Sequence, residues 1–105
     1  MNRELDNIRK DELIDILTNK LNVLRAEVGL SQQELADRMG VTRQTYGSIE
    51  SKKQRMTWQN FITLLLLFRS NEETAKLIDF IGAYPPDLEQ YMKLKGKKDI
   101  DDTLP

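Results

Sequence analysis

The sequence contains no cysteine and no histidine. Their absence excludes disulfide bonds, thiolate metal sites and the usual zinc ligands, and it removes the most common general base of enzymes. Adjacent acids such as Asp101 and Asp102 diverge on a helix or a strand, and we interpret them as solvated charge. We therefore expect no enzymatic activity, no metal and no cofactor.

Long apolar segments are also missing. The longest run covers residues 64–68, far below the roughly 20 residues of a membrane-spanning helix, and the first residues lack the apolar core of a signal peptide. We expect a soluble cytoplasmic protein that does not enter a membrane. A length of 105 residues favours one domain with one core.

The net charge is only −1, which taken alone argues against a nucleic-acid partner. The distribution of the charges is more informative than their sum. Residues 41–58 contain a single acid, Glu50, and the bases Arg43, Lys52, Lys53 and Arg55. One side of the molecule should therefore be positive and the rest negative.

Apolar residues spaced three or four positions apart predict an amphipathic helix over residues 11–28 that ends at Gly29. These apolar positions are Leu13, Leu17, Leu21, Leu24 and Val28. The preceding residues 1–10 are predicted to form an N-terminal arm or a short helix.

A short helix is predicted next, over residues 32–39. Ser31 and Glu34 have the spacing of a capping box, in which each side chain satisfies a free amide at the start of the helix. Leu35, Ala36 and Met39 follow at helical spacing. The helix should end at Gly40, because glycine accepts the left-handed backbone of a C-terminal cap.

A second short helix is predicted over residues 43–51, with Thr42 as its N-cap. Tyr46 and Ile49 fall on one face, which should point to the core. The opposite face carries no acid and consists of small and polar residues, namely Gln44, Gly47, Ser48 and Ser51, with Arg43 at its flank. Glu50 is on the side turned toward the protein.

These two helices resemble the helix-turn-helix of the phage repressor and Cro (XRE) family. The residues that carry the resemblance are Gln32, Leu35, Ala36, Gly40, Val41, Tyr46, Ile49 and Glu50. The similarity covers roughly residues 21–68 and implies an all-α fold, a five-helix repressor-like DNA-binding domain. To this domain the sequence adds an N-terminal extension and a short C-terminal helix.

The resemblance also implies a structural ion pair between Arg25 and Glu50, which would fix the angle between two helices. It further implies that the loop after the second helix runs along the phosphate backbone of DNA.

Two groups of DNA contacts are predicted. Base contacts are assigned to the start and exposed face of the second helix, where Arg suits guanine and Gln suits adenine because each forms two hydrogen bonds at once. These residues are Arg43, Gln44, Gly47 and Ser48. Backbone contacts, which position a protein without reading sequence, are assigned to Gln32, Thr42, Thr45, Ser51, Lys52, Lys53 and Gln54.

The helix predicted over residues 57–68 is apolar on nearly every side, and such a helix must be covered on every side. Either the later helices of the chain or a second subunit could cover it. We assign a candidate dimer or partner surface to Trp58, Phe61, Leu64, Leu67 and Phe68.

Beyond this helix, a capping box of Ser70 and Glu73 predicts a further helix that ends at Gly82. Residues 87–95 predict a short helix stopped by Gly96. We accordingly divide the chain into an N-terminal arm (1–10), a repressor-like domain (11–82), a C-terminal helical extension (83–96) and a disordered tail (97–105).

The sequence thus predicts a transcriptional regulator, a repressor, that binds a specific double-stranded DNA sequence in the major groove through the helix of residues 43–51. We expect a homodimer, since two recognition helices placed about 34 Å apart reach successive major grooves. Two alternatives stay open. One is an antitoxin-type autoregulator that also binds a toxin, and the other is a protein-interaction adaptor.

Overall fold

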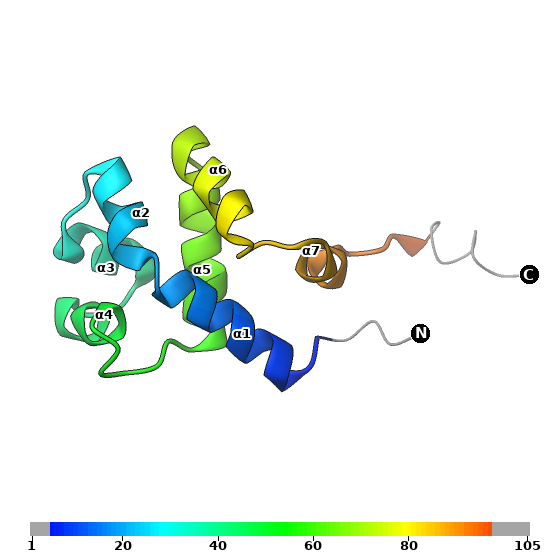
Figure 1. Ribbon diagram of the computed structural model, residues 1–105, viewed down its shortest axis with the longest axis horizontal. Coiled ribbons are helices and arrows are strands. Elements are labelled where there is room, and N and C mark those ends of the chain that lie inside the picture. The colour runs from blue at the N-terminus through cyan, green and yellow to red at the C-terminus, as the bar shows by residue number, and fades with distance from the viewer. Residues whose placement is uncertain (1–4, 98–105) are drawn as a thin grey trace, which may run out of the picture.

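The computed structural model describes residues 5–97, and within this part of the chain all regular structure is helical (Figure 1). The predicted all-α class is confirmed. In chain order the helices are α1 (Asn7–Thr18), α2 (Leu21–Val28), α3 (Gln32–Met39), α4 (Arg43–Glu50), α5 (Trp58–Arg69), α6 (Glu72–Ile81) and α7 (Pro86–Met92). Among residues 5–97, no helix is long and apolar enough to cross a membrane.

The long helix predicted over residues 11–28 is in fact two helices, so that prediction is wrong. The first begins earlier, at Asn7, where the Asp6 side chain accepts a hydrogen bond from the amide of Arg9. The chain then turns at Asn19 and Lys20 before α2 starts. Leu17 and Leu21, on either side of the turn, are both fully buried. The turn therefore leaves both apolar faces on one core.

Helix α5 lies at the centre of the molecule and contacts α1, α3 and α6 (Figure 1). Its residues Phe61, Leu64 and Phe68 are at most 2% exposed, and they cannot form the dimer or partner surface assigned to them. Trp58 and Leu67, the other members of that set, are half-buried, and Trp58 stacks on Phe61 at 4.8 Å. The chain itself thus covers most of α5, because helices on three sides pack against it.

Helix α6 begins one residue later than the predicted capping box implies. Asn71, and not Ser70, is its N-cap, with the Asn71 side chain accepting from the amides of Glu73 and Thr74. The Ser70 hydroxyl instead donates to the carbonyl of Leu67. The predicted end at Gly82 is observed, where φ is +78°.

Helix α7 is shorter than predicted, because Lys93 is already extended with ψ 122°. It packs against the start of α1. Leu88 is fully buried, and Arg9 donates to both carboxylate oxygens of Asp87 at 2.7 and 3.1 Å. The Lys10 ammonium lies over the rings of Trp58 and Tyr91. The prediction of a disordered tail falls mostly on residues 98–105, outside the described residues.

Candidate nucleic-acid interface

The turn between α3 and α4 is built from the local signals seen in the sequence. Ser31 and Glu34 form the predicted capping box. Gly40 adopts the left-handed conformation, with φ +76°, and so lets the chain reverse directly after α3. Thr42 then caps α4, its hydroxyl accepting from the amide of Thr45 at 3.0 Å. Helix α4 ends at Glu50, and Ser51 is its C-cap.

One face of α4 is buried and the other is open. Tyr46 and Ile49 are fully buried, as the periodicity predicts. On the opposite face, Arg43, Gln44 and Ser51 are exposed, whereas Gly47 and Ser48 are half-buried by the helix surface around them. This helix lies at one end of the molecule, away from α7 (Figure 1). Its open face is therefore accessible to a large partner.

Glu50, the only acid of α4, is held inside the protein by three side chains. Arg25 donates to both of its carboxylate oxygens, from Nε at 3.0 Å and from Nη2 at 2.9 Å. Gln32 Nε2 donates at 3.2 Å, and the Tyr46 hydroxyl donates to the second oxygen. Its hydrogen bonds with Arg25, above all, hold the pKa of Glu50 below its usual value. The carboxylate stays ionised, and its charge is compensated.

Gln32, which we assigned to the DNA backbone, is engaged within the protein. Its side-chain nitrogen donates to Glu50, and its side-chain oxygen lies 3.5 Å from the position that a Cβ on residue 47 would occupy. The side chain is half-buried between α3 and α4. Gln32 therefore helps to position α4, and its contact with phosphate stays a prediction.

The loop after α4 is exposed and is held in shape by its own backbone. The amides of Lys53 and Gln54 both donate to the carbonyl of Ser48, at 2.9 and 3.1 Å. Lys52 adopts φ +68°, a left-handed conformation that is uncommon for a residue with a side chain. The side chains of Ser51, Lys52, Lys53 and Gln54 are exposed, as phosphate contacts require.

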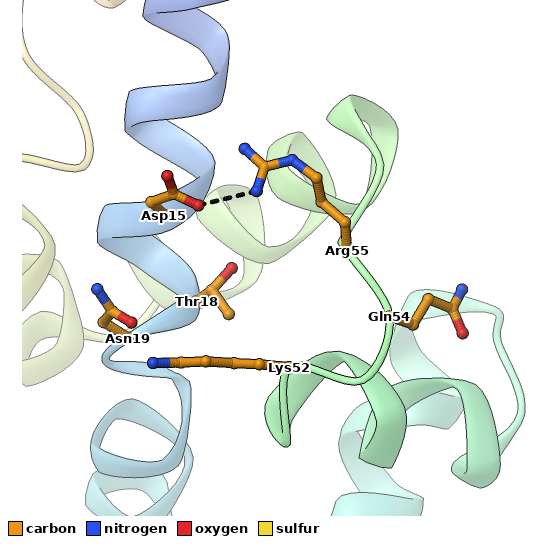
Figure 2. Close-up of a pocket in the computed structure, with 6 residues that line it drawn as sticks. All are labelled: Asp15, Thr18, Asn19, Lys52, Gln54 and Arg55. Carbon is orange, nitrogen blue, oxygen red and sulfur yellow. Dashed lines mark hydrogen bonds and ion pairs between the residues drawn. The ribbon is translucent and has the colours of Figure 1, made fainter.

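Arg55, one of the four bases among residues 41–58, is paired with acids of helix α1. Its guanidinium is 2.9 Å from the carboxylate of Asp15 (Figure 2). It is also 3.3 Å from the carboxylate of Asp11 and donates to the Asp11 carbonyl. The net positive charge of the loop therefore comes from Lys52 and Lys53. Arg55 instead ties the loop to α1.

The comparison with protein families decides the nature of this arrangement. Residues 21–65 match the family model described as helix-turn-helix. This segment is an XRE-type helix-turn-helix. The match begins at the first residue of α2 and ends within α5. Comparisons with curated proteins and with solved structures found no match.

The helix-turn-helix of residues 21–65 supports a DNA-binding transcriptional regulator of the XRE type. The match confirms the resemblance drawn from the sequence, and α3 and α4 both lie inside the matched segment. Families of this kind are regulatory and not enzymatic. Within residues 5–97, no group of three or more side chains has the arrangement of a metal site.

Sequence analysis missed one feature beside the helix-turn-helix, the corner where α1 meets α2. Two adjoining hollows lie between this corner and the end of α4. Thr18 and Asn19 line both of them, and Asn22 lines the second. The apolar residues keep their helical spacing across the turn that creates the corner. The sequence therefore did not indicate the corner.

Proposed function

We propose that this chain is a transcriptional repressor that recognises a specific sequence of duplex DNA by placing α4 in the major groove. One observation supports this above all others. The open face of α4 carries no free acid, because its single carboxylate is turned inward and compensated by Arg25. A polyanion can therefore approach the helix along its whole exposed side.

Arg43 and Gln44 are proposed to read base edges. Both are exposed in the first turn of α4, the part of a recognition helix that commonly enters the groove first. Arg can donate two hydrogen bonds to guanine, and Gln can pair with adenine through the oxygen and the nitrogen of its side-chain amide. Gly47 and Ser48 carry little bulk, so they allow the helix backbone to come close to the bases.

The backbone of the duplex is proposed to lie against the two ends of α4. Thr42 and Thr45 are at its start, and the loop residues Ser51, Lys52, Lys53 and Gln54 follow its end. The exposed ammonium groups of Lys52 and Lys53 would supply the salt-dependent part of the affinity.

We further propose that the protein binds as a homodimer in the cytoplasm, because one eight-residue helix reads few base pairs. A two-fold dimer places two such helices in successive major grooves, about 34 Å apart. Repression needs only that the bound site overlap a promoter. The buried side chains of α5 are not available for the dimer contact.

An antitoxin-type autoregulator is a second candidate, and one observation favours it. Phe80 on α6 and Leu66 on α5 are 86% and 72% exposed. Large exposed apolar side chains on neighbouring helices are typical of a protein interface. Copurification of the product of an adjacent reading frame, lost in Phe80→Ser, would favour this candidate.

Selection of bound duplexes from a random pool tests the main proposal. We expect enrichment of a pseudo-palindrome with half-sites about 10 base pairs apart, since a dimer would dictate that spacing. A reporter gene preceded by the selected site should be repressed when the protein is present. Recovery of unrelated sequences with equal affinity would contradict sequence-specific binding.

A further inference from the structure

Two polar hollows flank the C-terminal end of α4 and share one edge. The shared edge consists of Thr18, Asn19 and Lys52. The first hollow has a volume of about 370 Å³, and its other lining residues are Asp15, Gln54 and Arg55 (Figure 2). The second has a volume of about 300 Å³, and its other lining residues are Asn22, Gln32, Gly47, Glu50 and Ser51. The second hollow thus adjoins the open face of the recognition helix.

Three unengaged hydrogen-bond donors border the second hollow. The side chains of Asn19, Asn22 and Lys52 are exposed, and within residues 5–97 none of them makes a hydrogen bond or an ion pair. Figure 2 shows Lys52 extended across from the loop toward Asn19. Two amide groups and one ammonium group therefore face the same space. Such donors suit the oxygen atoms of a phosphate, which only accept hydrogen bonds.

The two acids that line the hollows, Glu50 and Asp15, are each engaged with an arginine, although Asp15 shares Arg55 with Asp11. Glu50, in the wall of the second hollow, accepts from Arg25, Gln32 and Tyr46. Asp15, in the first hollow, is paired with Arg55 at 2.9 Å. An anion that enters the second hollow consequently meets the charge of Lys52 without an opposing free carboxylate.

We propose that the corner between α1 and α2 binds one backbone phosphate of the duplex through Asn19, Asn22 and Lys52. The proposal rests on the proposed function, since it requires α4 to occupy the groove. The hollow adjoins Gly47 and Ser51, so a phosphate held there belongs to the strand at the C-terminal end of the recognition helix. Asn19 lies outside the segment that matches the family model. Asn22 and Lys52 lie inside that segment, so the corner joins one residue of the turn before α2 to the helix-turn-helix surface.

The first test compares two changes that add the same negative charge in different places. Asn22→Asp places the charge in the hollow, and Gln90→Glu places it on the exposed surface of α7. Asn22 is in the first turn of α2, where an acid favours the helix, so the variant should fold. Circular dichroism measures whether the Asn22→Asp variant keeps the helical content of the wild type.

Binding to a selected duplex is measured by fluorescence anisotropy over a range of salt concentrations. We expect Asn22→Asp to weaken binding about tenfold and to reduce the slope of log K against log salt by about 0.9, the value for one phosphate. Gln90→Glu should change affinity by less than about twofold, because that site is far from the duplex. Equal affinities of the two variants would overturn the proposal and leave the proposed function intact.

The second test locates the phosphate. Each phosphate of the duplex is replaced in turn by a neutral methylphosphonate. One position should weaken binding of the wild type but not of Asn22→Asp, because the aspartate repels the charge that the replacement removes. If no position shows this coupling, the phosphate site does not exist. If the wild type binds no duplex at all, the proposed function has failed as well.

A free anion is the other source of the same chemistry. If the hollow holds a backbone phosphate, free phosphate competes for it, so replacing chloride by inorganic phosphate at constant ionic strength should weaken DNA binding by the wild type more than by Asn22→Asp. Binding of inorganic phosphate by the wild type that Asn22→Asp abolishes, with equal affinities of both proteins for the duplex, would assign the hollow to free phosphate and overturn the DNA assignment.

Discussion

The Arg25 guanidinium and the Glu50 carboxylate meet side by side, with Nε 3.0 Å from one oxygen and Nη2 2.9 Å from the other. This two-point contact joins the middle of α2 to the last residue of α4. A third donor of Arg25, Nη1, bonds the carbonyl of Leu30 in the loop before α3. One side chain of α2 thereby holds both α4 and the loop before α3.

Removal of Arg25 should destabilise the fold. Arg25→Ala leaves Glu50 mostly buried, at 13% side-chain exposure, without its main partner. We expect a loss of about 3 kcal/mol, at the low end for a buried ion pair because Arg25 is partly exposed. Thermal unfolding followed by circular dichroism measures it. Arg38→Ala, which removes an exposed arginine from α3, is the control. Equal melting temperatures of the two variants would contradict the structural role of Arg25.

The same pair should make stability depend on pH in the acidic range. The pKa of Glu50 is lowered in the folded protein, chiefly by its hydrogen bonds with Arg25. Its stabilising contribution is therefore complete above the ordinary carboxylate pKa near 4.5 and is lost as pH falls through the lower folded value. Urea unfolding from pH 7 to pH 3 should show the advantage of wild type over Glu50→Gln shrinking across this window. An advantage that is constant with pH would refute the assignment.

Replacement of Gly47 by alanine should raise the stability of the protein and lower its affinity for DNA. A Cβ at this position meets only Gln32 Oε1 at 3.5 Å, an ordinary contact, and the backbone is helical. Gly47→Ala should therefore stabilise the protein by up to about 1 kcal/mol through helix propensity. The added methyl group stands on the proposed groove face, so affinity for the selected duplex should fall. If thermal stability and affinity rise together, Gly47 does not face the bases.

The side chains of Arg43 and Lys53 should contribute differently to DNA binding, the first to sequence preference and the second to affinity for any sequence. Arg43→Ala is expected to cost about 1 to 3 kcal/mol on the selected duplex and to relax the preference at one base pair. Lys53→Ala should weaken binding to all sequences equally and reduce the salt dependence. Competition binding against single-base variants of the site measures both effects. Equal losses on selected and random DNA for Arg43→Ala would rule out direct readout by this residue.

The helix-turn-helix was predictable because its signals are local. The side chains of Ser31, Glu34 and Thr42 each accept from a backbone amide three residues away, and the left-handed backbone of Gly40 ends α3. Their spacing alone therefore sets the start of both helices and the end of α3. The Arg25 to Glu50 pair followed from the resemblance. The base contacts at Arg43 and Gln44 stay predictions, since both side chains are exposed and their contacts depend on the partner.

The remaining features depend on tertiary packing, which the sequence does not encode locally. The spacing of Leu17 and Leu21 fits one continuous helix, and it fits two helices joined by a turn equally well. The sequence therefore does not predict the break at Asn19. The all-apolar pattern of α5 shows that it needs cover but not which elements provide it. In the sequence Arg55 has no acid beside it. In the folded protein Asp15, which is 40 residues earlier in the chain, lies 2.9 Å from its guanidinium.

The seating of α7 on the first turns of α1 has a practical consequence. The Arg9 to Asp87 contact gathers the early and late parts of the described chain at the end of the molecule opposite α4 (Figure 1). A reporter or affinity label attached to an exposed side chain of α7, such as Gln90, would lie at that far end. Labelled protein should thus be suitable for measuring DNA binding in living cells, because the label would not cover the exposed face of α4.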